Sequence, residues 1–246
     1  MYHLRVTFAT TSRLLQQLSH DHRTLAMIFV VPCLLLSLLA WLFSDNERMF
    51  DQLGPSLLAI FPMIIMFLIT SIATLRERTS GTLERILTTP IGKMDILLGY
   101  ALAFGILAII QAAIASTVSL WLLGMDVAGP EWMLIVIALS DALLGSALGL
   151  MLSAFARSEF QAVQFMPAFI LPQLLLCGLL VPLDKMPDIL EAIARALPMT
   201  YAVEAMQNIA MKTDISEQTF HDLWIVLGVA VVAIMFGALT LRRRSR

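Results

Sequence analysis

Charged residues are scarce in this sequence, and their scarcity is the first limit on what the chain can be. They make up 14% of the 246 residues, whereas hydrophobic residues make up 59%. Soluble domains carry about a quarter charged residues. The mean hydropathy is +0.85. A globule of this size has too little interior to hide so much apolar surface from water. The composition therefore excludes a soluble enzyme, a disordered regulator and a fibrous repeat, and it indicates an integral membrane protein.

Cysteine and the residues of common cofactor sites are also scarce. Cys33 and Cys177 stand in apolar runs, where thiols pack as small hydrophobic groups, and they form no disulfide framework or metal-ligand spacing. Three of the four histidines fall within the first 22 residues, so no cluster suggests a metal site. No stretch matches the phosphate-binding loop G-x-x-x-x-G-K-S/T. We therefore predict no catalytic residue, cofactor or metal on this chain. The net charge of −2 gives no field that attracts nucleic acid.

Apolar runs long enough to cross a bilayer recur along the chain. A spanning helix needs about 20 apolar residues. We place six spans at residues 25–43, 55–75, 96–125, 132–156, 160–183 and 223–241. Two prolines in the fifth run, Pro167 and Pro172, predict a kinked helix there. The predicted fold class is an all-α integral membrane protein with six transmembrane helices, in a single domain over residues 1–246.

Basic residues gather on one side of these predicted spans. Twelve of the sixteen fall in the two termini and in the connections after the second and fourth spans, and four fall on the opposite side. This excess predicts that both termini are cytoplasmic. The tryptophans stand at the other ends of their spans, where the headgroup layer favours an indole ring: Trp41, Trp121, Trp132 and Trp224.

The segment ahead of the first span, residues 1–24, has the pattern of an amphipathic helix. Apolar residues at helical spacing share one face over residues 3–22, with arginines elsewhere on the surface: Leu4, Phe8, Leu15 and Leu18. We predict a helix that lies in the inner membrane interface. An unstructured basic tail is the alternative.

The connection over residues 76–95 is rich in charge of both signs. Leu83, Ile86 and Leu87 are spaced for one face of a short helix, which Gly81 would start and Pro90 would stop. An exposed amphipathic helix held between two spans suits the docking of a soluble partner. A solvated loop with one helical turn is the alternative.

The stretch over residues 181–222, on the predicted outer side, contains several prolines. An apolar stripe follows Pro187, and a semi-polar segment with apolar patches follows Pro198. We interpret these as two short helices that dip into the outer leaflet or lie on it. Irregular backbone at that depth requires cover by protein or contact with a watery cavity.

Asp141 is the one ionisable residue inside the predicted spans. By the rise of about 1.5 Å per residue it lies near the middle of the bilayer, at a depth similar to that of Gln111 and Gln173. A carboxylate there costs several kcal/mol unless it is protonated, hydrated or paired. The three residues are candidates for a polar translocation path. An interhelical hydrogen bond that locks the packing is the alternative for Asp141.

Two stretches of the sequence carry a resemblance to a known family. Residues 75–90, LRERTSGTLERILTTP, resemble the cytoplasmic loop of ABC-2 type permeases, the membrane subunits of bacterial ABC exporters. The outer stretch, from GLLVP at residues 178–182 to LPMTY at residues 197–201, resembles the region between the last two spans of that family. The likeness covers essentially the whole chain and is strongest to the daunorubicin-resistance and nodulation-type branch.

The resemblance implies a mechanism and a set of partners. Such permeases pair as homodimers or heterodimers in the bacterial inner membrane and bind two ABC ATPase subunits, which hold ATP and Mg²⁺. The helix after Gly81 would be the coupling helix seated in the ATPase, and residues expected at that joint are Glu77, Gly81, Thr82, Glu84, Arg85 and Pro90. An outer lid would form near Pro187, Pro198 and Tyr201.

The expected function is thus outward transport of an amphipathic small molecule, drug or lipid-like substrate by alternating access. The chain itself would not be an enzyme. An ion-coupled secondary transporter that uses Asp141 is the alternative, and it would be favoured by an inverted internal repeat. We find no convincing repeat between the two halves of the sequence.

Overall fold

The computed structural model describes residues 2–81 and 92–240, and this part of the chain consists of helices joined by turns and loops, without strands. This confirms the all-α prediction. The elements in chain order are α1 (Tyr2–Ser19), α2 (His22–Leu42), α3 (Glu47–Thr79), α5 (Lys93–Thr117), the π-helical turn η1 (Val118–Leu122), α6 (Glu131–Leu152), α7 (Glu159–Leu176), the 3-10 turn η2 (Leu183–Lys185), α8 (Asp188–Arg195), α9 (Pro198–Met211) and α10 (Glu217–Thr240).

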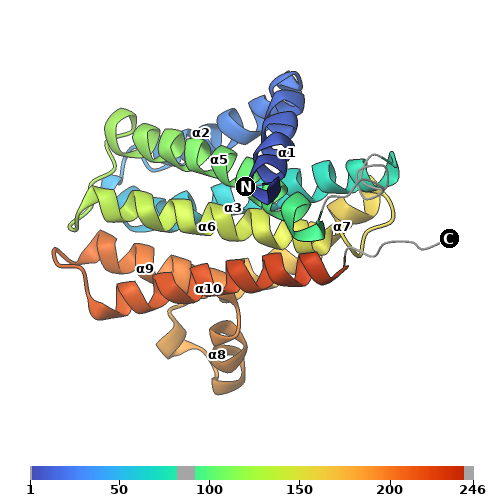
Figure 1. Cartoon of the computed structure of the whole chain (residues 1–246). Helices are drawn as coiled ribbons and strands as arrows, with labels where there is room; N and C mark the ends of the chain where they lie inside the picture. The colour runs from blue at the N-terminus through green and yellow to red at the C-terminus, as the bar shows by residue number, and fades with distance from the viewer. Residues whose placement is uncertain (1, 82–91, 241–246) are drawn as a thin grey trace.

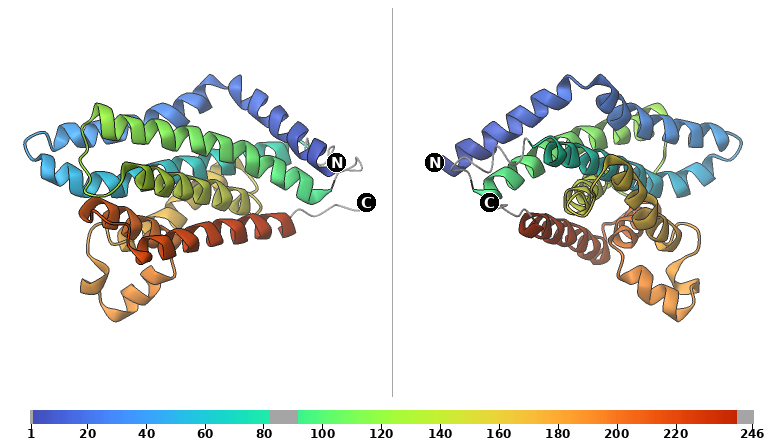
Figure 2. Two further views of the ribbon diagram at one scale, coloured as in Figure 1. Left: turned by 60° about the vertical axis from the view of Figure 1, so that its left-hand side comes forward. Right: turned by 90° about the vertical axis from the view of Figure 1, so that its right-hand side faces the viewer.

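The long helices run roughly alongside one another (Figure 1). We call the end where α3 finishes and α5 begins the inner end, and the end that carries the four tryptophans the outer end. α10 finishes at the inner end, on the same side as the start of α1 (Figure 2). All four tryptophans are more than half exposed, as expected of rings that lie in a headgroup layer.

Five of the described helices are long and apolar enough to cross a membrane: 22–42, 48–79, 95–122, 131–152 and 217–237. They correspond to five of the six predicted spans. The remaining predicted span, residues 160–183, is interrupted in the structure. Its helix α7 ends at Leu176, and the chain then turns through Gly178, whose φ of +87° suits a residue without a side chain.

The chain then leaves the bundle before it re-enters (Figure 1). The 3-10 turn η2 and helix α8 project to one side, and α9 then continues to the outer end against α3, α6 and α10. Pro198 occupies the first turn of α9, where a missing N–H costs nothing. The two short outer helices predicted from the sequence are therefore present, and α9 belongs to the packed bundle.

Helix α6 is the centre of the bundle, with 14 of its 22 residues buried. Gly145 and Gly149 allow α3 to approach it closely. A Cβ atom at Gly145 would lie 2.3 Å from the Met63 carbonyl oxygen, and one at Gly149 would lie 2.5 Å from that of Phe67. No side chain fits at these distances, so this small-xxx-small pair fixes the contact between α3 and α6.

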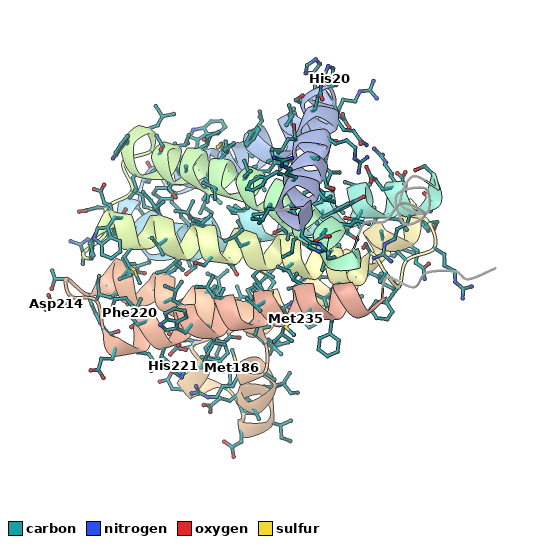
Figure 3. All side chains as sticks on the ribbon, viewed as in Figure 1. His20, Met186, Asp214, Phe220, His221 and Met235 are labelled. Carbon is teal, nitrogen blue, oxygen red and sulfur yellow. The ribbon has the colours of Figure 1, made fainter. Side chains whose placement is uncertain are left out.

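The helices at the periphery of the bundle, such as α2 and α10, turn apolar side chains away from the protein. In the most apolar stretch of α2, 17% of the residues are buried inside the protein, against 78% in the corresponding stretch of α6. The exposed side chains include Met235 on α10 (Figure 3), together with Leu34 and Leu38 on α2. Lipid solvates such a surface, whereas water would not.

Candidate functional site

A polar junction between helices lies at the inner end, around the connection between α3 and α5. The predicted coupling residues Thr82, Glu84, Arg85 and Pro90 fall in residues 82–91, outside the described residues. The structure describes the two helix ends on either side. Gly81 follows the end of α3 with a φ of +73°, a conformation that side chains disfavour. We call α1, the last turn of α3 and the first turns of α5 the inner joint.

Glu77 is the central residue of the inner joint. Its side chain is 4% exposed, and both of its carboxylate oxygens accept hydrogen bonds within the chain. Arg13 of α1 donates two of them, at 2.9 and 2.8 Å, in a bidentate pair. The Tyr100 hydroxyl of α5 donates another. One carboxylate therefore joins three helices, and its hydrogen bonds raise the pKa of Arg13 above its ordinary value.

Sequence reasoning found only one member of this triad. Glu77 was singled out by the motif, whereas Arg13 counted only toward the basic side and Tyr100 only toward an apolar run. The residue type alone could have indicated that partners exist, because a buried carboxylate requires hydrogen-bond donors around it. Its partners come from positions 64 residues before it and 23 residues after it, which no local pattern connects.

Two further contacts tie α1 to α5. The His3 imidazole lies 2.7 Å from an Asp95 carboxylate oxygen, which also accepts a hydrogen bond from the Gly92 N–H at the start of α5. The Thr11 hydroxyl lies 3.1 Å from the Gly99 carbonyl oxygen, and a Cβ atom at Gly99 would lie 2.7 Å from the Cβ of Thr10. The backbones of the two helices approach closely here, so α1 is packed tightly against the start of α5.

An ion pair on the surface connects α3 to α7. Arg76 donates two hydrogen bonds to Glu159, at 2.8 and 3.0 Å, and lowers the pKa of Glu159 below its ordinary value. Both side chains are about half exposed. Water and salt screen such a pair, so its contribution to stability is small.

The glutamines proposed for the translocation path lie inside the protomer. Gln111 is 1% exposed and donates to the Ile28 carbonyl at 2.9 Å, which links α5 to α2. Gln173 is also 1% exposed, donates to the Phe169 carbonyl, and accepts from the Met199 N–H at 3.4 Å, which links α7 to α9. Both side chains connect helices in the way that was considered for Asp141.

Asp141 differs from the two glutamines because it has no hydrogen-bond partner among the described residues. The side chain is 0% exposed, and neither carboxylate oxygen is bonded. Cys177, just beyond the end of α7, lies within electrostatic range of it. The alternative of an interhelical hydrogen bond that locks the packing therefore has no partner group in this part of the structure.

The predicted lid residues hold α8 against α9. Pro187 precedes α8, and Pro198 begins α9. The Tyr201 hydroxyl donates to the Arg195 carbonyl at 2.6 Å, and the Thr200 hydroxyl donates to the Ala194 carbonyl at 2.7 Å. These bonds fix the sharp turn between the two helices by capping the last carbonyls of α8. Thr200 was missed by the sequence analysis.

Comparisons with known proteins point to one family. The family model described as "ABC-2 type transporter" matches residues 5–211. The chain is 28% identical to the probable multidrug ABC transporter permease YbhS of Escherichia coli over 77% of its own length and 51% of YbhS. It is 28% identical to the linearmycin resistance permease protein LnrN of Bacillus subtilis over 68% of its length and 41% of LnrN. It is 24% identical to ABC transporter G family member 20 of Dictyostelium discoideum over 82% of its length. The chain thus spans only part of the length of these relatives: 51% of YbhS, 41% of LnrN and 28% of ABC transporter G family member 20.

Proposed function

The chain belongs to the ABC-2 type transporter family, and from this premise we propose that it is the membrane-spanning permease subunit of an ATP-driven exporter. ATP and Mg²⁺ would be bound by two separate ABC ATPase subunits. The membrane partner would be a second permease, either an identical copy or a sister chain. The location would be the inner membrane of a bacterium, with both termini in the cytoplasm.

The observation that carries this proposal is the triad at the inner joint. Arg13, Glu77 and Tyr100 bind α1, α3 and α5 together at the two ends of the connection that bears the family's loop motif. A push applied to residues 82–91 by an ATPase would be transmitted to all three helices at once. Since the carboxylate of Glu77 is already bonded within the chain, we expect it to position these helices, and we expect Glu84 and Arg85 to contact the ATPase.

The substrate class that fits the proposal is an amphipathic small molecule. Two of the similar proteins carry the words multidrug and linearmycin resistance in their names. A charged polymer would need more lining charge than the spans of this chain contain. Closure of the ATPases would switch the path at the permease interface from inward- to outward-facing, with α8 and α9 near Pro187, Pro198 and Tyr201 as the outer lid.

Transport assays in inside-out membrane vesicles test the proposal. With the partner ATPase co-expressed, a panel of amphipathic dyes is offered in the presence of ATP, before and after an ionophore collapses the proton and sodium gradients. We expect uptake of at least one dye that needs ATP and survives the ionophore. Uptake that needs a gradient and not ATP would overturn the proposal in favour of a secondary transporter that uses Asp141.

Variants of the loop motif test the coupling step. We expect Glu84→Ala or Arg85→Ala to reduce both dye uptake and dye-stimulated ATP hydrolysis, because they would remove polar contacts across the ATPase joint. Glu217→Ala, at the outer end of α10, is the matched control and should change neither. Unchanged coupling in Glu84→Ala and Arg85→Ala would contradict the assignment of this loop.

A further inference from the structure

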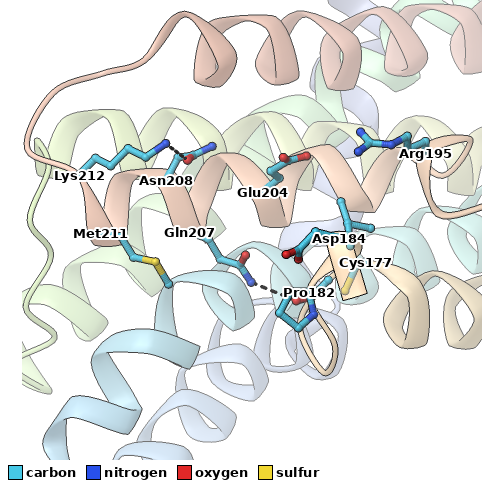
Figure 4. Close-up of a pocket in the computed structure, with 11 residues that line it drawn as sticks. Cys177, Pro182, Asp184, Arg195, Glu204, Gln207, Asn208, Met211 and Lys212 are labelled. Carbon is cyan, nitrogen blue, oxygen red and sulfur yellow. Dashed lines mark hydrogen bonds between the residues drawn. The ribbon is translucent and has the colours of Figure 1, made fainter. Parts of the chain in front are cut away.

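A pocket of about 350 Å³ lies far from the inner joint, between α9 and the segment that connects α7 to α8 (Figure 4). This volume is in the range of small-molecule sites in proteins. Part of the lining is apolar, with Cys177 at the start of the connecting segment, Pro182 and Leu183 further along it, and Met211 on α9. These residues offer a surface for the apolar body of a ligand.

Two carboxyl groups line the same pocket, one from each wall. Asp184 belongs to η2 and Glu204 to α9, and Figure 4 shows both among the lining side chains. Neither carboxylate forms a hydrogen bond or an ion pair with the described part of the chain. Asp184 is exposed and Glu204 is partly buried, so both carboxylates are open to a ligand in the pocket.

The cationic side chains at the pocket are already engaged. Arg195 donates to Glu191 one turn earlier on α8, at 2.9 Å, and this pairing raises the pKa of Arg195. The Lys212 ammonium donates to the Asn208 side-chain oxygen at 2.7 Å. In Figure 4 the Lys212 side chain points toward Asn208, at the far end of the pocket from Asp184.

One more carboxyl group stands behind the lining. Asp222 of α10 is buried and within electrostatic range of Glu204. One of its oxygens accepts from Gln218, with the His221 ring 3.6 Å away, and the other oxygen has no described partner.

The charged groups at the pocket leave a small negative balance. Asp184 and Glu204 line it together with Arg195 and Lys212, and Glu191 offsets the charge of Arg195. Among the described residues, no three histidine, cysteine or acidic side chains cluster as metal ligands. An extended cation therefore fits this pocket better than a metal ion does.

We propose that this pocket binds an organic cation with an apolar body, such as a quaternary or tertiary amine amphiphile, and holds its charge between Asp184 and Glu204. Binding at this site does not require the ATPase. The proposal names a ligand class for the permease of the proposed function, but its test uses the purified permease, so it succeeds or fails separately from the transport assays.

The experiment measures equilibrium binding of radiolabelled tetraphenylphosphonium to the purified permease, with tetraphenylborate as an anion of nearly the same shape. We expect saturable binding of the cation. Asp184→Asn and Glu204→Gln should each weaken it by about three- to tenfold, as loss of a partly desolvated charge contact does. Glu191→Ala should weaken it as well, although Glu191 does not line the pocket, because the positive charge of Arg195 is then no longer offset by a neighbouring carboxylate.

Glu131→Gln is the matched control, since Glu131 is an exposed acid at the outer end that does not line the pocket. It should bind the cation as the unchanged protein does. Variants count as folded if their thermal unfolding midpoint lies within about 2–3 °C of that of the unchanged protein. Such a shift corresponds to a change in unfolding free energy of less than about 1 kcal/mol. Unchanged cation affinity in both Asp184→Asn and Glu204→Gln would overturn the proposal. An equal loss of tetraphenylborate binding in these variants would also overturn it, because the effect would then not depend on charge.

Discussion

Two of the carboxyl groups buried in this helical bundle, Glu77 and Asp141, have completely different surroundings. Glu77, at the inner joint, is 4% exposed and accepts hydrogen bonds from Arg13 and Tyr100. Asp141, in the middle of α6, is 0% exposed and accepts none from the described residues. Burial alone therefore does not tell what an acidic side chain does. The donors around it decide whether it holds helices together or remains available to another group.

The same contrast separates the two regions as a whole. At the inner joint, acids are used up in contacts between helices, such as His3 with Asp95 and Arg76 with Glu159. At the outer pocket, Asp184 and Glu204 have no such partner. A region that must transmit force needs fixed contacts, whereas a region that receives a ligand needs open ones. The four predictions below test this difference, from the largest expected effect to the smallest.

The largest effect is expected for Glu77→Ala. This change leaves the guanidinium of Arg13 and the hydroxyl of Tyr100 without their acceptor. Loss of one partner of a buried pair costs several kcal/mol, and because Arg13 partly regains water we expect about 2 to 3 kcal/mol. The thermal unfolding midpoint of the purified permease measures the loss.

Arg13→Ala is the companion variant. It leaves the bond from Tyr100 to Glu77 in place, so the cost should be smaller than for Glu77→Ala. The double variant Arg13→Ala, Glu77→Ala should lose less unfolding free energy than the two single variants lose together, since the two residues share one interaction. Full additivity would show that the pair does not join α1 to α3 energetically.

The next effect has the opposite sign and concerns Asp141→Leu. Leucine branches at the same position as aspartate and nearly keeps its shape, and it removes a buried polar group that has no described partner. We expect stabilisation by about 1 to 2 kcal/mol. The unfolding midpoint should therefore rise, where it falls for Glu77→Ala. A fall of similar size would indicate that Asp141 has a partner that matters for folding.

Transport by Asp141→Asn sharpens the same point. Asparagine keeps the size of the side chain and removes its ability to ionise. We expect this variant to change dye transport in vesicles more than it changes the unfolding midpoint. A loss of expression and stability with normal transport per folded molecule would place Asp141 among the packing residues.

A smaller effect is expected where α1 touches α5. Gly99→Ala would place a Cβ atom 2.7 Å from the Cβ of Thr10, so the two helices would have to separate. Overpacking of this kind costs about 1 to 2 kcal/mol. Gly228→Ala is the matched control, because nothing lies within 4 Å of a Cβ atom there. Its expected change is a gain of about 0.5 to 1 kcal/mol from helix propensity.

Much of the fold could be predicted because the membrane imposes a simple rule. Runs of apolar residues had to become helices, and five of the six predicted spans match helices long enough to cross. The run at residues 160–183 shows the limit of that rule. Pro167 and Pro172 predicted a kink, but the end of the helix at Leu176 depends on Gly178 and on the packing of α9, which hydropathy does not report.

The candidate site was less predictable because its contacts are long-range. The motif pointed to Glu77, yet the residues that bond to it lie on α1 and α5 and carry no motif of their own. Gln111 and Gln173 were chosen for their depth, and depth does not distinguish a side chain that faces a path from one that bonds to the next helix. Asp184 and Glu204 were absent from the prediction, since only the fold brings η2 beside α9.

The smallest effect is expected for Arg76→Gln, which breaks the exposed pair with Glu159. Both side chains are about half exposed, so the change in stability at neutral pH should stay within about 0.5 kcal/mol. Arg76 lowers the pKa of Glu159, so the pair stabilises the protein above the ordinary pKa of that carboxyl and loses this contribution as the pH falls through the lowered value. The difference in unfolding midpoint between Arg76→Gln and the unchanged protein should therefore shrink as the pH is lowered from 7 through the acid range. A difference as large as that of Glu77→Ala would mean that exposed and buried pairs contribute alike at the inner end, and the contrast drawn between them would fail.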